Sequence, residues 1–161
     1  MSVKIQDNFL PKEVFNSIKN TMMGVNFDWY YSNAITEEKL NRKEFQFVHM
    51  FYHWGKPRPS YSVIEPLINQ IMPFSLVRAK ANLLTVTNEI VTYDFHKDFL
   101  RDNLTTAVFY INTCNGYTLF KDGTKVDSVE NRLVSFDSGL EHTGTSCTDE
   151  NIRVVINLNY F

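Results

Sequence analysis

Most of this sequence either alternates apolar and polar residues or runs through β-branched and aromatic residues, and this pattern constrains the fold more than any other feature. Turn signals such as Lys121-Asp122-Gly123 and Asp137-Ser138-Gly139 interrupt it. The pattern predicts strands at 27–34, 45–54, 75–86, 90–95, 105–112, 117–120, 131–136 and 152–160. Many short strands of this kind predict a sheet sandwich or a barrel.

Two segments have the spacing of amphipathic helices instead. In 11–23 apolar residues recur every three or four positions, and Pro11 suits the first turn of a helix. In 61–72 apolar residues again line one side, and Pro73 favours a helix end before it. We therefore expect a mostly β fold with flanking helices.

The composition is that of one globular domain. Of the 161 residues, 43% are hydrophobic and 21% are charged. A chain of this length can bury a substantial core, and no repeat, linker or low-complexity segment divides it. We expect a single domain over 1–161.

Charge and cysteine content argue against several classes of partner. The formal net charge is −2 and the pI is about 6.1, so we expect no nucleic acid partner. Cys114 and Cys147 lack the spacing of a redox motif or disulfide framework, and this suits a reducing compartment. There is no signal-peptide core, and no apolar run approaches the roughly 18 residues of a membrane span. These features predict a cytoplasmic protein with no membrane partner.

A histidine and a carboxylate lie one residue apart in the segment TYDFHKDF. On a strand, His96 and Asp98 would point to the same face, because successive side chains alternate. His142, which follows the strand pattern RLVSF and a turn, is a candidate third ligand from a neighbouring strand. Two imidazoles and one carboxylate form the facial triad of non-haem Fe(II) oxygenases. Taken alone, H-x-D is a weak signal that fits a solvated surface strand better than a metal site.

An arginine in the last strand pattern favours the metal-site interpretation. Arg153 follows His142 by eleven positions and lies in an otherwise apolar alternating segment, where burial of a cation requires an anionic partner. A planar guanidinium suits the capture of a carboxylate by two parallel hydrogen bonds.

The C-terminal half now resembles a known family. The ordered segments YDFHKDF, AVFYIN, GYTLF, NRLVSFDSGLEHTGT and IRVVINLNYF are similar to the 2-oxoglutarate and Fe(II)-dependent dioxygenases of the prolyl 4-hydroxylase type. The resemblance covers roughly residues 75–161. It implies a double-stranded β-helix, a cupin-like jelly-roll barrel with N-terminal support helices and the iron inside its open end.

The resemblance also implies a role for individual residues. His96, Asp98 and His142 would hold Fe(II), and Arg153 would bind the distal carboxylate of 2-oxoglutarate. Tyr110 and Asn82 match positions that contact 2-oxoglutarate in relatives, and Tyr93 matches one that packs beside the metal. The implied reaction uses O2, with ascorbate as a supporting reductant, and hydroxylates a substrate while releasing succinate and carbon dioxide.

The substrate is left open between a peptidyl residue, proline included, and a small molecule. The family's glycine-glycine-acid-threonine pattern is replaced by the sequence NGYT at 115–118, and its Tyr-x-x-Gly segment is replaced by LLTVTNEIV. In FQFVHMFYHW, alternation places His49 and His53 on one strand face with Phe45, Phe47 and Phe51. That face either packs on the core or lines the substrate mouth beside a mobile loop at 54–60.

Two other functions remain compatible with the chain. One is a non-catalytic jelly-roll module that binds a ligand at its mouth. The other is a cupin-like metalloenzyme that does not use 2-oxoglutarate. The intact triad together with Arg153 and Tyr110 favours the dioxygenase, because neither alternative requires all of these residues.

Overall fold

The computed structural model describes residues 3–35, 44–99, 101 and 103–161. Within them the chain forms, in order, β1 (Lys4–Gln6), α1 (Lys12–Met22), β2 (Tyr30–Ser32), β3 (Gln46–His53), β4 (Lys56–Pro57), α2 (Tyr61–Ile71), β5 (Leu76–Thr85), β6 (Thr105–Tyr110), β7 (Tyr117–Phe120), β8 (Lys125–Asp127), β9 (Leu133–Asp137), β10 (His142–Gly144) and β11 (Ile152–Tyr160). The mostly β prediction is confirmed.

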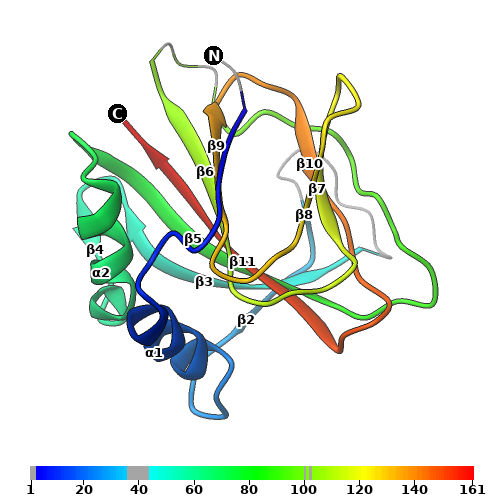
Figure 1. Ribbon diagram of the computed structural model, residues 1–161, viewed down its shortest axis with the longest axis horizontal. Coiled ribbons are helices and arrows are strands. Elements are labelled where there is room, and N and C mark those ends of the chain that lie inside the picture. The colour runs from blue at the N-terminus through cyan, green and yellow to red at the C-terminus, as the bar shows by residue number, and fades with distance from the viewer. Residues whose placement is uncertain (1–2, 36–43, 100, 102) are drawn as a thin grey trace.

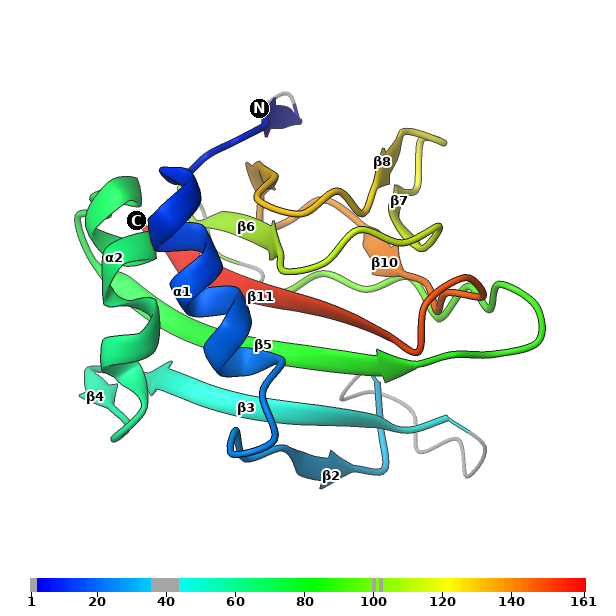
Figure 2. The same cartoon turned by 60° about the horizontal axis from the view of Figure 1, so that its bottom comes forward.

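The strands form two antiparallel sheets. The larger sheet has the order β1-β9-β6-β11-β5-β3-β2, with β4 added to β3, and the smaller has the order β10-β7-β8. β11 is the centre of the larger sheet, because it pairs with β5 along its whole length and with β6 from Val155 to Tyr160. The smaller sheet lies across from the larger one (Figures 1 and 2).

Both helices cover the same outer face of the larger sheet, as Figure 2 shows. Their buried side chains are those that the helical spacing predicts, with Phe15, Ile18 and Met22 on α1 and Ile64, Leu67 and Ile68 on α2. They pack against sheet residues that include Ala81, Phe109 and Ile156. The predicted helices are therefore confirmed to within about one residue at each end.

The central strands are buried on both faces, and the two faces differ in chemistry. On β6, Ala107 and Phe109 join the core under the helices, whereas Val108 and Tyr110 point between the sheets. On β11, Ile156 and Leu158 likewise face the helices. Alternate positions on β11 carry the polar side chains of Arg153, Asn157 and Asn159, with Val155 among them, into the space between the sheets, because successive residues of a strand face opposite ways. This polar inner face positions the site.

Several predicted strand bounds are wrong. No strand covers 90–95, where Thr92 alone makes an isolated bridge, to Thr145, and His96 just beyond makes another, to His142. The strand predicted at 27–34 is reduced to β2. Four short strands, β1, β4, β8 and β10, were not predicted, because three residues or fewer carry too little alternation to register as a pattern.

The aromatic face predicted for β3 is interrupted by a bulge between Met50 and Tyr52. His49 pairs with Ala81 on the helix-facing side of the sheet. Beyond the bulge His53 pairs with Arg78, whose side chain lines the opposite face, so the two histidines do not share one face. One extra residue on a bulged strand shifts the alternation that follows it.

The segment expected to be a loop at 54–60 begins as a tight hairpin. Trp54 and Gly55 both have positive φ, 45° and 78°, and β4 then pairs back onto β3. Two consecutive left-handed residues are the requirement of a two-residue hairpin turn.

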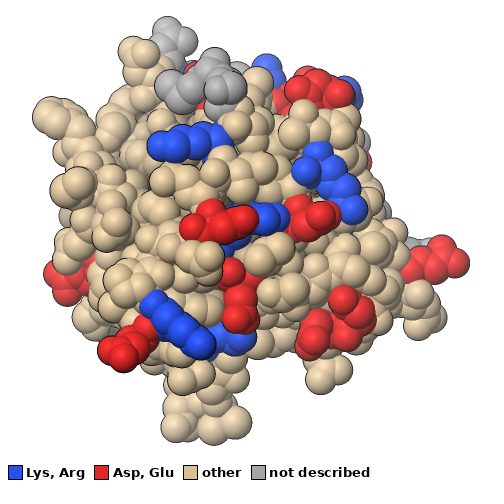
Figure 3. All heavy atoms as spheres, in the orientation of Figure 1, with Lys and Arg blue, Asp and Glu red and all other residues tan. Residues whose placement is uncertain are grey.

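The surface carries mixed charge. On the face seen in Figure 3, lysines and arginines are interspersed with aspartates and glutamates. In the described part of the chain, neither helix has the length and apolarity needed to cross a membrane.

The core under the helices yields a stability prediction. Phe109 is fully buried and makes edge-on ring contacts with Phe9 and Phe15 at centroid distances of 6.3 and 6.0 Å. We expect Phe109→Ala to lower the free energy of unfolding by about 3–5 kcal/mol in a urea titration. Phe74, which is 95% exposed, is the matched control, and Phe74→Ala should change stability by less than about 0.5 kcal/mol. Equal effects of the two changes would contradict the assignment of this core.

Candidate metal centre

The two candidate histidine ligands are brought together by backbone pairing. His96 N donates to His142 O and His142 N donates to His96 O, both at 3.0 Å. The centroids of the two imidazole rings lie 4.7 Å apart. His142 begins β10 and its ring also packs against Phe136. The pair therefore depends on a contact between segments 46 positions apart, and not on a strand that carries the H-x-D motif.

Each imidazole presents one nitrogen to the site. Nδ1 of His142 lies 3.0 Å from the carbonyl oxygen of Leu140, and Nδ1 of His96 lies 3.3 Å from that of Asp94. A carbonyl accepts only from a protonated nitrogen, so these contacts favour the tautomer in which Nε2 carries a lone pair. Such a contact is the usual outer support of a metal-binding histidine.

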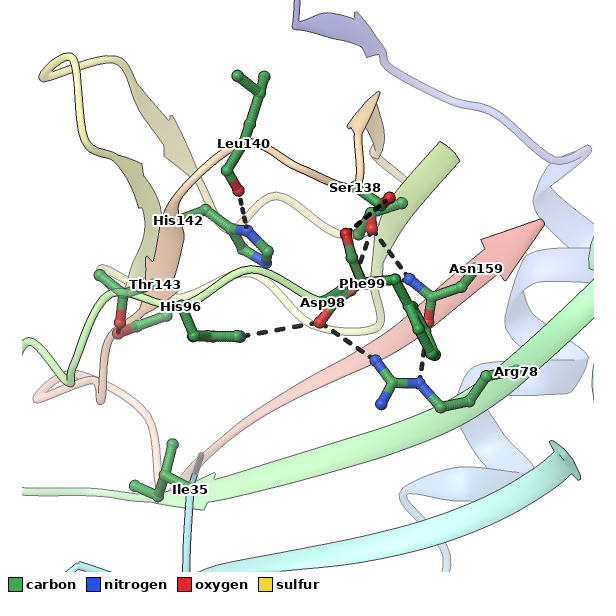
Figure 4. A network of polar contacts seen from close by, with 12 residues as sticks. Ile35, Arg78, His96, Asp98, Phe99, Ser138, Leu140, His142, Thr143 and Asn159 are labelled. Atoms are coloured by element: carbon green, nitrogen blue, oxygen red, sulfur yellow. Dashed lines mark hydrogen bonds and ion pairs between the residues drawn. The ribbon is translucent and has the colours of Figure 1, made fainter. Parts of the chain in front are cut away.

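Asp98 completes a group whose ligand atoms all lie within 4.8 Å of one another. Figure 4 shows how the carboxylate is held. Oδ1 lies 3.1 Å from a terminal nitrogen of Arg78 and 3.8 Å from Nε2 of His96. Oδ2 accepts hydrogen bonds from Thr106 at 3.1 Å and from Asn159 at 2.9 Å. The side chain is only 4% exposed, so these contacts take the place of water.

The electrostatics of the group suit metal binding. Burial alone would raise the pKa of Asp98, but the charge of Arg78, with smaller contributions from His142 and the Asn159 hydrogen bond, lowers it below its usual value. Burial lowers the pKa of His142, although the Asp98 charge opposes this. A carboxylate that stays ionised and an imidazole that stays neutral are the protonation states that a divalent metal requires.

A cavity of about 430 Å³ opens beside this group. His96, Asp98 and His142 line it, as do residues of the inner faces of β5, β6 and β11. It also contains Arg153, which is 3% exposed. The structure thus brings the predicted metal ligands and the predicted carboxylate-binding residue to one cavity.

Arg153 is a buried cation without a carboxylate partner among the described residues. Nε donates to Ser128 Oγ at 2.7 Å, and one terminal nitrogen lies 3.4 Å from Thr118 Oγ1. The guanidinium lies over the ring of Tyr110, 5.7 Å from its centroid. Gly116 makes room for it, because a Cβ atom at that position would lie 2.6 Å from Arg153 Cδ. Within the described ranges, neutral oxygens satisfy part of its hydrogen bonding and leave its charge uncompensated.

The other predicted contact residues have different positions. Asn82 and Tyr93 line the cavity, and the buried amide oxygen of Asn82 has no hydrogen-bond partner among the described residues. Tyr110 lies behind the cavity lining, fully buried, and its hydroxyl donates to Thr118 Oγ1 at 2.8 Å. Burial raises the pKa of Tyr110. Thr118 therefore lies between Tyr110 and Arg153.

The remaining histidines are not part of the group. Nδ1 of His49 lies 2.6 Å from the carbonyl oxygen of Asp28, and Nε2 lies 2.5 Å from Ser60 Oγ, so both ring nitrogens have partners. The ring packs against Phe51 in the core under the helices. His53 is exposed, and neither histidine lines the cavity. The packing interpretation of His49 agrees with these contacts.

A second cluster of ligand-type residues is less suited to a metal. Cys114, Cys147 and Asp149 lie close together, but both carboxylate oxygens of Asp149 already accept from the backbone N–H of Asn115. Burial raises the pKa of Cys147 to about 11, and this opposes formation of the thiolate that a metal needs.

Sequence reasoning missed the residues that support the ligands. Arg78, Thr106 and Asn159 hold Asp98, and Ser128 holds Arg153. A signal was present in β5 and β11, where polar residues alternate with alanine or aliphatic residues in VRAKAN and VINLN. Such alternation inside a long apolar pattern indicates one polar buried face.

Known proteins resemble this chain in structure and not detectably in sequence. Neither a protein-family model nor a curated protein matches it. A Trichoplax adhaerens prolyl hydroxylase, solved with a peptide of the hypoxia inducible factor oxygen degradation domain, has a TM-score of 0.66 at 18% identity, covering 99% of this chain and 83% of its own. A Pseudomonas putida prolyl-4-hydroxylase has a TM-score of 0.62 at 16% identity, covering 98% and 91%.

A third structure, an oxidoreductase of the 2OG-Fe(II) oxygenase family from Burkholderia pseudomallei, has a TM-score of 0.68 at 8% identity, covering 98% of this chain and 84% of its own. These likenesses show that the chain has the jelly-roll fold of the prolyl 4-hydroxylase-like 2-oxoglutarate and Fe(II) oxygenases. The predicted jelly-roll fold is confirmed.

The ligand geometry yields a prediction about metal binding. His96→Gln, His142→Gln and Asp98→Ala should each weaken Mn(II) binding, measured by calorimetry, by more than the roughly 10- to 100-fold that loss of an outer supporting residue costs. His49→Gln is the matched control and should leave the dissociation constant within a few-fold. Loss of metal binding in the His49 variant would show that the wrong histidines have been assigned.

Proposed function

We propose that this protein is an Fe(II)- and 2-oxoglutarate-dependent dioxygenase that hydroxylates a peptidyl residue, proline included, or a small molecule. His96, Asp98 and His142 would hold the iron. Arg153 would bind the distal carboxylate of 2-oxoglutarate, with Asn82 lining the same cavity and Tyr110 beneath the guanidinium. The proposal assigns residues 1–161 to one such domain. Its helices would support the barrel, and the protein would act in the cytoplasm.

The observation that carries the proposal is the charge of Arg153, which no carboxylate of the described residues compensates, in the cavity that the His-Asp-His group lines. A buried guanidinium is costly unless an anion reaches it. A carboxylate ligand would provide that anion, and a dicarboxylate could also reach the metal. A binding module or a metalloenzyme without 2-oxoglutarate has no need of this arginine.

Other residues of the cavity fit a polar guest. The buried amide oxygens of Asn82 and Asn157 have no hydrogen-bond partner in the part of the chain that the structure describes, and both side chains line the cavity. An orphaned buried acceptor costs free energy unless a ligand or water donates to it. The carboxylate and two imidazoles of the metal group are ligands that suit Fe(II). The residues present therefore fit both cofactors.

The chain's contribution to the reaction would be binding, orientation and exclusion of water. Bound Fe(II) and 2-oxoglutarate would supply the oxidising chemistry with O2, releasing succinate and carbon dioxide, with ascorbate supporting the iron. Asp98 would remain ionised through its contacts with Arg78, Thr106 and Asn159. A buried cavity wall would keep water from the reacting atoms.

The proposal is tested by adding 2-oxoglutarate to the Fe(II)-loaded protein without oxygen. We expect the weak visible charge-transfer band of the chelate to appear, and succinate to form once O2 and a substrate are admitted. Absence of the band from protein that calorimetry shows to be metal-loaded would refute the use of 2-oxoglutarate.

Arg153 yields a second prediction. Arg153→Ala removes a charge-assisted contact in a desolvated site, so the KM for 2-oxoglutarate should rise by at least about a hundredfold, or about 2.7 kcal/mol. Mn(II) affinity should barely change. Arg153→Lys should recover part of the loss, because it keeps the charge and loses the planar fork. Unchanged affinity for 2-oxoglutarate in the alanine variant would remove the main support for the proposal.

Gly116 provides an independent check on the position of Arg153. A Cβ atom here would lie 2.6 Å from Arg153 Cδ and 2.6 Å from the carbonyl oxygen of Ser146. Gly116→Ala should displace the arginine and raise the KM for 2-oxoglutarate at least about tenfold, a change of about 1.4 kcal/mol. Mn(II) binding is the internal control. A variant with parental affinity for both ligands would show that the arginine side chain tolerates displacement.

A further inference from the structure

Arg78 is an arginine fixed on three sides next to the metal group. One terminal nitrogen contacts Asp98 Oδ1 at 3.1 Å, and Nε donates to Asn159 Oδ1 at 2.9 Å. The guanidinium also lies over the ring of Phe99, 5.0 Å from its centroid. Asn159 is held in turn, because its amide nitrogen donates to Asp98 and Thr106. The guanidinium therefore has little rotational freedom to lose on binding a ligand.

The same guanidinium keeps a free edge. Arg78 lines the cavity and its side chain is 13% exposed. In the described part of the chain, no acceptor is bonded to its other terminal nitrogen, and Figure 4 shows that nitrogen pointing away from both Asp98 and Asn159. Guanidinium has five N–H donors, so donors remain for an acceptor in the cavity.

The charge around the cavity favours an anion at this edge. Leaving aside Lys80, which has a contact of its own, the described lining residues include three cationic side chains, Arg78, Lys97 and Arg153, against the single carboxylate of Asp98, an excess of two positive charges. A divalent metal and 2-oxoglutarate would add opposite charges of equal size and leave this excess unchanged. Metal coordination by Asp98 would also withdraw charge from the one carboxylate that now balances Arg78.

From these contacts we propose that the substrate carries a carboxylate, which Arg78 binds beside the metal. Arg78 is then a substrate-binding residue, and Asn159 and Phe99 are residues that position it. The inference rests on the proposed function, since it names the class of substrate for that reaction. A fixed planar fork suits a carboxylate better than a neutral amide, because only the anion gains a charge-assisted hydrogen bond.

Aromatic rings lie beside Arg78. Phe99 lines the cavity, and Trp54 of the β3–β4 hairpin packs edge-on against it at a centroid distance of 6.2 Å. Trp54 is 50% exposed, and Arg101 lies over its ring. Phe99, backed by Trp54, would provide an apolar wall for the rest of an acid whose carboxylate reaches Arg78.

The test uses matched acids and amides on protein loaded with Fe(II) and saturated with 2-oxoglutarate, without oxygen. The probes are N-acetyl-L-leucine, N-acetyl-L-phenylalanine and N-acetyl-L-proline, each compared with its carboxamide. Binding is measured as a change in the charge-transfer band. Saturating 2-oxoglutarate keeps the probes away from Arg153. We expect at least one acid to bind at least about tenfold more tightly than its amide.

Variants then assign the preference. Arg78→Gln should abolish it, and Arg78→Lys should retain part of it while keeping a cation beside Asp98. Arg132→Gln is the matched control, because Arg132 is also paired with a carboxylate, that of Asp7, but lies outside the cavity lining. If the Arg78→Gln variant no longer binds the metal, the Arg78→Lys variant is used in its place. An acid-over-amide preference in the lysine variant equal to that of the parent protein would then count against the proposal.

Three results would overturn the inference: equal binding of acids and amides, no change in the band with any probe, or an acid preference that survives Arg78→Gln. Failure of the proposed function has a different signature, because 2-oxoglutarate would then produce no band at all. In that case the same probes are added to Mn(II)-loaded Arg153→Ala protein, and binding is followed through water proton relaxation. An acid preference there that depends on Arg78 would support the binding site without the reaction.

Discussion

The carboxylate of Asp98 is almost completely buried, and its contacts with Arg78, Thr106 and Asn159 are the constraint on which the site depends. These partners come from β5, β6 and β11, the three neighbouring strands at the centre of the larger sheet. A buried charge that lost one of them would be left partly uncompensated, at a cost of several kcal/mol. The central strands therefore both form the wall of the cavity and keep its carboxylate ionised.

The larger sheet can do this because its two faces have separate tasks. The outer face is apolar and packs under the helices, so it supplies hydrophobic stabilisation. The inner face carries arginine and asparagine side chains, of which Arg78 and Asn159 hydrogen-bond to each other and both contact Asp98. Among the described residues, the amide oxygens of Asn82 and Asn157 lack hydrogen-bond partners and the charge of Arg153 lacks a carboxylate partner. All three side chains line the cavity. The incompletely satisfied groups thus coincide with the place where a ligand would bind.

The three candidate metal ligands are supported by different sheets. Asp98 is held by the rigid larger sheet, whereas His96 lies in an irregular segment and is positioned through its backbone bridge to His142 on the smaller sheet. The cavity lies where these two supports meet. Displacement of one sheet relative to the other would separate the ligands, so metal binding should couple the two sheets. Aromatic contacts of His142 with Phe120 and Phe136 strengthen its support.

The sequence by itself determined the mostly β fold, the two helices and the candidate ligands, because periodicity and residue chemistry are local properties. The tertiary structure alone decided that His96 pairs with His142, that a bulge in β3 separates the faces of His49 and His53, and that Arg78 contacts Asp98. Register, bulges and short strands depend on contacts between distant segments, and one extra residue reverses every side chain that follows it. No local pattern contains that information.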